Sequence, residues 1–257
     1  MKKRSKSGVL IGLGLLCAFY PLAAGCASSW RMRQALSTFQ SANATLDARS
    51  LARKKERRAL LNESEGEERE ALYASIEAEG IIARVRIPII DVDLPVYAGT
   101  GEETLQKGVG HWPSSDVPPG GPGARMVLTG HRGLSSHRLF TRLDELKPGD
   151  RIWLDVYDES LAYRVETIEV IEPSALERLA PREGKDLLSL VTCTPYGLNT
   201  HRLVVTGERD GSASVEEPPQ KRKLPSWREL AFGLLPFALL GAVCRRGKEK
   251  RICGKNY

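Results

Sequence analysis

The sequence has few cysteines, and four of the five lie in or beside the apolar ends of the chain: Cys17, Cys26, Cys244 and Cys253. Cys193 is the only thiol of the long region between these ends. A single thiol cannot form an internal disulfide, so this region folds without one. An unpaired cysteine in a domain that faces an oxidising space is a candidate reactive thiol. An inert, buried cysteine is the alternative, because free cysteine is among the most buried residue types.

Charged residues are absent from residues 8–27, and basic residues precede this run. Such a run is long enough to span a bilayer, and the charges before it predict a membrane anchor whose N-terminus is cytoplasmic. A cleaved signal peptide and a lipoprotein signal at Cys26 are alternatives, because small residues precede that cysteine. A second apolar run, residues 227–244, is followed by the basic tail 245–257 and predicts a second span. An amphipathic surface helix is the alternative for this second run.

The net charge of +6 comes from these basic ends, because the region between them is mildly acidic. The charge therefore gives no reason to expect a nucleic-acid partner, and its placement is instead typical of a membrane protein. If both apolar runs span the cell membrane, both termini are cytoplasmic and the region between the runs is extracytoplasmic.

Proline is absent from residues 22–87, and residues 30–80 are rich in alanine, leucine, glutamate and arginine. This composition predicts an N-terminal helical region that follows the anchor segment 1–29 and breaks near Gly66. From residue 81 to residue 209, β-branched residues in short runs replace the helical pattern. Seven or eight short strands with little helix between them predict a mainly β fold, closed into a β-barrel. The aperiodic stretch 210–226 is predicted to be a linker.

Three side chains at the ends of predicted strands form a candidate acyl-transfer set. Cys193 ends one apolar run, His131 ends another, and Arg202 opens the strand that follows the cysteine. A hairpin over residues 194–201 would place Cys193 and Arg202 opposite each other. A histidine can activate the thiol and later protonate a leaving amine, while a guanidinium can stabilise an oxyanion.

The remaining histidines, His111, His137 and His201, do not have the spacing of a metal site. We expect no metal and no cofactor. His201 is expected to point away from the face that carries Arg202, because neighbouring strand residues alternate between faces.

The segments LTGHRG, LVTCTPYG and NTHRLVV closely resemble sortases, in particular the class C, or pilin-polymerising, branch. The resemblance extends over residues 87–209 and includes the cysteine motif of the family, with serine in place of its first threonine. It implies a sortase-type barrel in which Cys193 is the nucleophile, His131 the catalytic histidine and Arg202 the catalytic arginine. Thr192, next to the nucleophile, is a candidate substrate-binding residue.

The resemblance implies a transpeptidase that cuts an LPXTG-like sorting signal between threonine and glycine and keeps the acyl part as a thioacyl-enzyme. In the class C branch the acyl group passes to a lysine amine of a pilin subunit, so pilins are the expected partners and a covalent pilus the product. The alternatives are a sortase that anchors surface proteins to a cell-wall peptide, and a membrane-tethered binding module without activity.

Many class C sortases carry an N-terminal lid with an Asp-Pro-aromatic motif. The absence of proline from residues 22–87 excludes that motif here. The helical region 30–80 is therefore expected either to form a different flap over the site or to leave the site open.

Overall fold

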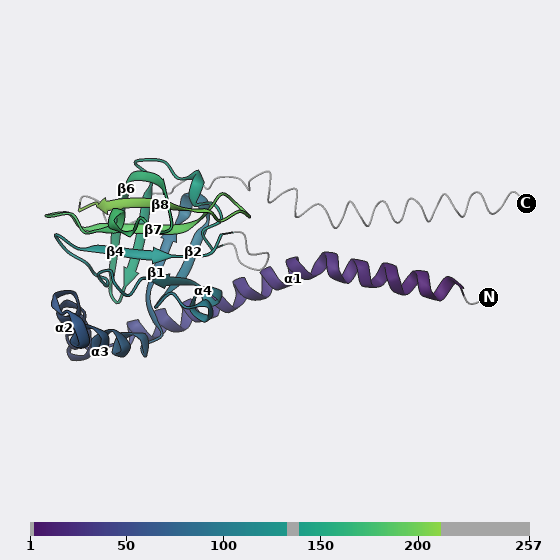
Figure 1. The fold of residues 1–257 in the computed structure, drawn as a ribbon. Helices are drawn as coiled ribbons and strands as arrows, with labels where there is room; N and C mark the ends of the chain where they lie inside the picture. The colour runs from purple at the N-terminus through teal and green to yellow at the C-terminus, as the bar shows by residue number, and fades with distance from the viewer. Residues whose placement is uncertain (1–2, 133–138, 212–257) are drawn as a thin grey trace, which may run out of the picture. The chain divides into compact units, whose positions relative to one another are not determined.

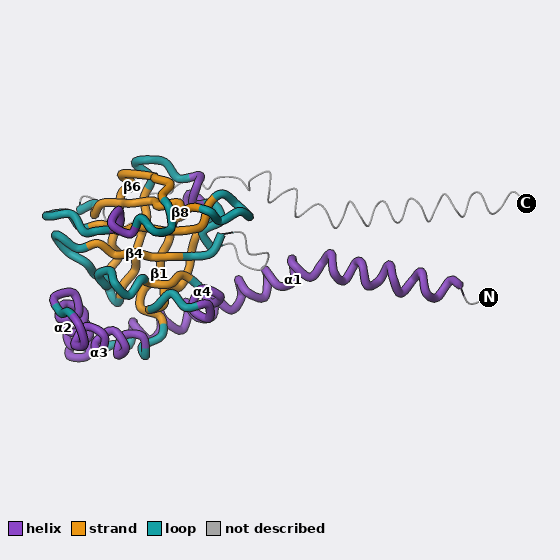
Figure 2. The backbone as a smooth tube through the Cα atoms, viewed as in Figure 1, coloured by secondary structure: helices purple, strands orange, loops and turns teal. Residues whose placement is uncertain are grey.

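Eight strands form a closed barrel in the computed structural model, which describes residues 3–132 and 139–211 (Figure 1). The chain divides into two compact units, and the barrel lies in the unit that spans residues 29–223. The strand order around the barrel is β1-β2-β3-β4-β7-β8-β6-β5. The predicted fold class, mainly β and closed, is confirmed, and Figure 2 shows the strands of the barrel in orange.

The strands are β1 (Ile81–Ile87), β2 (Val92–Ala98), β3 (Val109–His111), β4 (Arg125–Thr129), β5 (Arg151–Val156), β6 (Glu159–Ile171), β7 (Leu187–Thr194) and β8 (His201–Arg209). The α-helices are α1 (Lys3–Ala44), α2 (Ala48–Glu63), α3 (Gly66–Glu77) and α4 (Glu102–Lys107). Short 3-10 helices are η1 (Pro88–Ile90), η2 (Leu143–Glu145) and η3 (Leu176–Leu179). The helix break predicted near Gly66 is confirmed, because α2 ends and α3 begins there.

Helix α1 runs without interruption through the boundary predicted at residue 29 between an anchor and a helical region. Among the described residues, no helix has both the length and the apolar character needed to cross a membrane. The second predicted span, residues 227–244, and nearly all of the linker 210–226 lie outside the described residues, as does the tail 245–257.

The barrel interior is filled by alternate residues of each strand. On β7, Leu188 and Leu190 belong to the main hydrophobic core, whereas Val191 packs in a separate cluster on the outer face. Because side chains alternate along a strand, Ser189 and Cys193 share the outer face with Val191. The nucleophile proposed from the sequence thus lies on the outside of the barrel wall.

Short elements interrupt the strands at two places. The strand-like run from residue 81 divides into β1 and β2, because η1 begins at Pro88 and Asp91 turns the chain with a φ of 58°. The stretch 108–123, which is rich in glycine and proline, contains β3. A strand of three residues is too short to give a periodic signal.

Helices α2 and α3 pack on the barrel near the ends of β7 and β8 that lie away from the β7–β8 turn (Figure 1). Arg58 of α2 is 1% exposed and donates hydrogen bonds to the carbonyls of Ile82 and Pro118. The next residue, Pro119, accepts a hydrogen bond from Arg209, the last residue of β8. These two helices therefore do not form a flap over the turn that carries the candidate site.

Candidate active site

The β7–β8 hairpin brings Cys193 directly opposite Arg202, as the sequence predicted. The turn between the strands contains two left-handed residues, Gly197 with a φ of 82° and Asn199 with a φ of 57°. The N–H of Asn199 donates to the carbonyl of Pro195 at 3.0 Å, which closes the turn. The hairpin thus fixes the thiol and the guanidinium on neighbouring strands.

His131 reaches the same place from β4, which runs parallel to β7. Directly after β4, the N–H of Gly130 donates to the carbonyl of Val191 at 3.1 Å, so the ladder continues past the strand end. The strand register, continued two residues past its last pair, places His131 beside Cys193. Cys193 therefore lies between His131 and Arg202 on the outer face of the barrel.

Gly130 fixes the backbone that leads into His131. Its carbonyl accepts a hydrogen bond from the Thr192 hydroxyl at 2.7 Å, and a Cβ at this position would lie only 2.9 Å from the Phe140 ring. The Phe140 N–H in turn donates to the His131 carbonyl at 3.1 Å. Thr192 is 1% exposed and so presents no surface to a substrate. The structure does not support the predicted substrate contact at Thr192, which instead holds the residue before His131.

The imidazole of His131 keeps one nitrogen free for proton transfer. The side chain is 27% exposed, and no group of the described residues hydrogen-bonds to its Nε2 atom. The nearest carboxylate oxygen is Oε2 of Glu102, at 3.9 Å in the first turn of α4. This distance is too long for a hydrogen bond, but it is short enough to attract a protonated ring. No sequence pattern indicated a role for Glu102, because α4 is a short helix without a clear periodicity.

Arg202 is anchored through one of its three nitrogens. Its Nη1 atom donates to the carbonyls of Asn199 at 3.2 Å and His201 at 3.1 Å. The described residues offer no hydrogen-bond partner to its Nε or Nη2 atom. A guanidinium held in this way can direct its remaining N–H groups at an oxyanion that forms on a substrate bound to Cys193.

A buried arginine joins the chain segments that follow the histidine and the cysteine. Arg132, directly after His131, has a side chain that is 4% exposed. Its Nη1 atom donates to the hydroxyl of Thr194, the residue after Cys193, at 3.1 Å, and its Nη2 atom donates to Asp144 at 2.5 Å. Sequence reasoning did not identify Arg132 or Asp144 as site residues. The signal was the position of Arg132 inside the LTGHRG segment.

The other histidines lie apart from this arrangement or outside the described residues. His201 is exposed, and its Nδ1 atom lies 2.9 Å from the Thr200 hydroxyl. His111 is fully buried under α3, where both of its ring nitrogens have hydrogen-bond partners. His137 lies in the stretch that the structure does not describe. Within residues 3–132 and 139–211 no three His, Cys, Asp or Glu side chains gather as a metal site would require.

Comparison with known proteins finds the same kind of domain. Residues 85–210 match the family model of the sortase domain. Sortase C-1 from Streptococcus pneumoniae is a similar solved structure, with 37% sequence identity and a TM-score of 0.65 over 70% of this chain and 100% of that chain. A structure described as a pilus-related sortase C of Group B Streptococcus has 30% identity and a TM-score of 0.62 over 68% of this chain and 96% of that one.

Among curated proteins, the chain is similar to sortase A of Bacillus anthracis, with 30% identity over 143 residues. This match covers 56% of the chain and 66% of the relative. The chain thus spans about two thirds of the length of that relative.

Proposed function

The chain belongs to the sortase family, in its class C branch, and on this premise we propose that it is a cysteine transpeptidase with Cys193 as its nucleophile. One observation carries the proposal: Cys193 lies between His131 and Arg202 on the outer face of the barrel. These are the base, the nucleophile and the oxyanion-stabilising group that acyl transfer through a thioester needs.

The first half of the proposed reaction cleaves a sorting signal of the LPXTG type. The sulfur of Cys193 attacks the carbonyl carbon of the threonine while His131 takes the thiol proton. Negative charge gathers on the carbonyl oxygen, where the guanidinium of Arg202 stabilises it. The carbon–nitrogen bond to glycine then breaks, and His131 returns its proton to the leaving amine. The threonine carbonyl is left as a thioester on Cys193.

The second half transfers this acyl group to an amine. The amine attacks the thioester, His131 accepts a proton from the nitrogen, and the sulfur of Cys193 leaves and is reprotonated. We propose that the amine belongs to a pilin lysine, because the similar class C structures include one described as pilus-related. Transfer to a cell-wall peptide is the second candidate and uses the same two steps.

The acceptor is tested by offering both amines to the same thioacyl-enzyme. A pilin with an available lysine and a wall-type peptide with a free amine are supplied at equal concentration, and the products are identified by mass spectrometry. Isopeptide-linked pilin as the main product supports polymerisation. The wall-peptide conjugate as the main product favours the anchoring function.

We further propose that the barrel works outside the cytoplasm, at the cell membrane. The proposal rests on the basic residues that flank the apolar runs 8–27 and 227–244 in the sequence. Protease treatment of intact cells that carry the full chain is the test. Loss of the barrel under these conditions supports the proposed location, and protection until the cells are lysed contradicts it.

The enzymatic activity is tested by replacing the nucleophile. Cys193→Ala is expected to abolish both cleavage of a sorting-signal peptide and the mass increase of the thioacyl adduct, while the thermal unfolding curve stays unchanged. Cys26→Ala is the matched control, because Cys26 is an exposed thiol of α1. Retained cleavage by the Cys193→Ala protein would contradict the assignment of Cys193 as the nucleophile. Absence of cleavage by the unaltered chain would favour the binding module.

A further inference from the structure

The outer face that carries Cys193 continues along the same strands toward a polar cluster. Next to the catalytic residues, Val191 and Val204 lie opposite each other and pack with Leu179 of η3. Two positions further along the strands, Ser189 and Thr206 lie opposite each other, and their hydroxyl oxygens are 3.0 Å apart. The face therefore runs from the nucleophile, over an apolar row, to a row of hydroxyl groups.

Arg125 of β4 lies over this polar row and is almost completely buried, with 3% of its surface exposed. Its Nε and Nη2 atoms donate to the hydroxyls of Ser189 and Thr206 at 2.9 and 3.0 Å. Its Nη1 atom donates to the carbonyls of Arg178 and Ala180 at 2.8 and 2.9 Å. All four partners are neutral, so a buried positive charge is held here by dipoles and without a carboxylate in direct contact.

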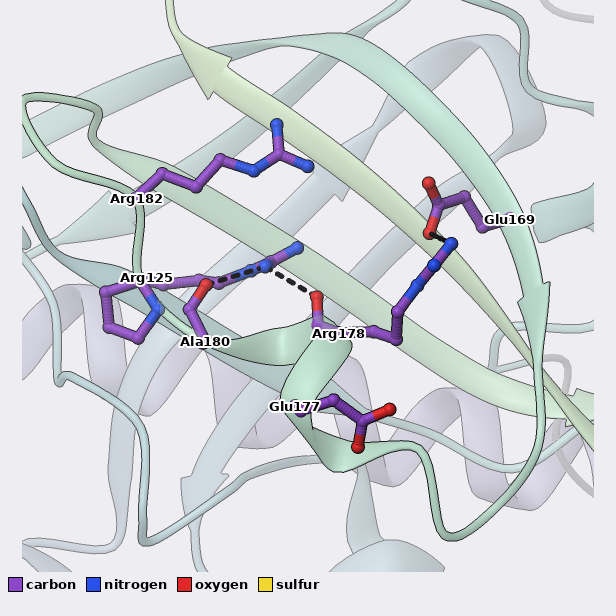
Figure 3. Close-up of a pocket in the computed structure, with 7 residues that line it drawn as sticks. Arg125, Glu169, Glu177, Arg178, Ala180 and Arg182 are labelled. Carbon is purple, nitrogen blue, oxygen red and sulfur yellow. Dashed lines mark hydrogen bonds and ion pairs between the residues drawn. The ribbon is translucent and has the colours of Figure 1, made fainter.

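A cavity of about 390 Å³ opens beside this guanidinium, under η3 and the segment that follows it. Figure 3 shows that the side chain of Arg182 extends over the cavity on the same side as Arg125. Two carboxylates also line the cavity. Glu169 is bound to Arg178 at 3.1 Å, and Glu177 points away from Arg125 and Arg182.

The two arginines repel each other across this space. Burial, together with the charge of Arg182, lowers the pKa of Arg125, whereas Glu169 and Glu166 raise it. Arg182 has an ion pair with Glu166 at 3.4 Å, but both side chains are more than a third exposed, so this contact is weak. An anion placed between the two guanidinium groups would relieve their repulsion and complete their hydrogen bonds.

The distance to the nucleophile suggests which anion this is. Four strand positions separate Ser189 from Cys193, which corresponds to about 13 Å along β7. Leu179 of η3 covers Val191 and Val204, so a bound peptide passes over η3 on its way from Cys193 to the cavity. An extended peptide covers the same distance in about four residues. If the threonine carbonyl of a sorting signal is at Cys193, the residue before its leucine reaches the cavity. The acyl side of the signal remains bound through both half-reactions, so a contact on this side assists both without delaying release of the leaving peptide.

We propose that the cavity between Arg125 and Arg182 binds an acidic side chain of the donor protein at the position directly before the leucine of its sorting signal. This inference rests on the proposed transpeptidase function and adds a charge requirement to its donor substrate. The donor is thereby recognised at two points, by the reacting threonine at Cys193 and by a carboxylate at the other end of the apolar row.

The test uses two sorting-signal peptides that differ only in glutamate or glutamine before the leucine. With the unaltered chain, the glutamate peptide is expected to have a KM about two- to fivefold lower and an unchanged kcat, the range expected of a partly exposed ion pair. The difference is expected to shrink at high salt. Arg182→Gln should remove the preference, and Arg182→Glu should reverse it toward a lysine peptide. Arg125 is less suited to substitution, because its buried hydrogen bonds also support the fold.

Arg164→Gln is the matched control, because Arg164 is also an exposed arginine of an ion pair but lies near the other end of β6. Equal KM values for the glutamate and glutamine peptides would overturn the inference, and so would a preference for the glutamate peptide that persists in Arg182→Glu.

A second measurement distinguishes failure of this inference from failure of the proposed function: the affinity of the Cys193→Ala chain for the glutamate and glutamine peptides. If that chain prefers the glutamate peptide but no peptide is ever cleaved, the acid-binding site stands and the transpeptidase function does not. Cleavage without any charge preference gives the opposite conclusion.

Discussion

The barrel holds one histidine in its candidate active site and another under helix α3, and the two differ in exposure and in hydrogen bonding. His131 follows β4, is partly exposed, and has an Nε2 atom without a hydrogen-bond partner among the described residues. His111 ends the neighbouring strand β3 and is fully buried. Its Nε2 atom lies 2.8 Å from the carbonyl of Asp116, and its Nδ1 atom lies 3.0 Å from the Tyr73 hydroxyl.

The contacts of His111 place a hydrogen on its Nε2 atom, because the Asp116 carbonyl can only accept. The Tyr73 hydroxyl lies within reach of both the Nδ1 atom and the backbone carbonyl of His111. Burial, with a contribution from the nearby positive charge of Arg58, lowers the pKa of His111 to about 4. Such a histidine serves the fold as a neutral polar link between the barrel and α3. His131, by contrast, has a ring nitrogen without a hydrogen-bond partner among the described residues, as the proton transfer proposed for it requires.

The sharpest test of this comparison exchanges each histidine for asparagine. His131→Asn is expected to lower kcat/KM by about 10²–10⁴-fold, because proton transfer by a positioned base contributes this much. Its midpoint of thermal unfolding should change little, because the ring makes no buried hydrogen bond that asparagine would leave unmatched. Peptide cleavage and calorimetry on the same samples measure both quantities.

His111→Asn is the control and should give the reverse pattern. It leaves the Tyr73 hydroxyl and the Asp116 carbonyl without the ring between them, at a cost of about 1–3 kcal/mol in the free energy of unfolding. The folded fraction should retain the kcat of the unaltered chain. A His111→Asn protein that is fully stable but catalytically dead would break the division of roles between the two histidines.

The low pKa of His111 also makes stability depend on pH in a defined direction. The unfolded chain binds a proton at this ring near its ordinary pKa of 6.5, whereas the folded chain resists protonation until pH is about 4. The pKa shift of His111 therefore makes its full contribution to the free energy of unfolding above pH 6.5. This contribution is lost as pH falls from 6.5 toward 4. The full loss is on the order of 3 kcal/mol.

Urea unfolding of the unaltered chain and of His111→Asn at several pH values measures this contribution. Carboxylates titrate in the same range in both proteins, so the difference between the two unfolding free energies isolates His111. That difference should narrow as the pH falls below 6.5. Two curves that remain parallel down to pH 4 would show that His111 is not held neutral by the fold.

Much of this arrangement could be predicted from the sequence, because it depends on strand pattern. Alternation over the β7 and β8 segments predicted that Cys193 and Arg202 face each other, and the structure confirms this register. The closed barrel followed from many short strands with little helix between them. The short elements β3 and α4 could not be predicted, because runs of three and six residues carry no reliable periodicity.

The buried polar contacts could not be predicted, because they join residues that are far apart in the sequence. Asp144 lies in η2, a short segment without a sequence motif, yet it holds the side chain of Arg132 directly after His131. Thr192 was assigned to the substrate from its place beside the cysteine, but it faces Gly130 inside the barrel wall. Burial and pairing of this kind depend on how the strands and loops come together in three dimensions, and one sequence does not specify that assembly.

The smallest predicted effect concerns Thr194, whose hydroxyl accepts from Arg132 at 3.1 Å. Thr194→Val keeps the shape of the side chain but removes the acceptor, leaving a donor of the buried guanidinium unmatched. Because this contact joins the residues after His131 and Cys193, its loss should loosen their alignment. We expect kcat to fall by up to about tenfold with KM little changed, since misplaced reacting groups slow the chemical step. Thr194→Ser keeps the hydroxyl and should restore kcat. An equal loss of kcat in both variants would mean that packing of the threonine methyl, and not the hydrogen bond, sets the position of the thiol relative to the free imidazole.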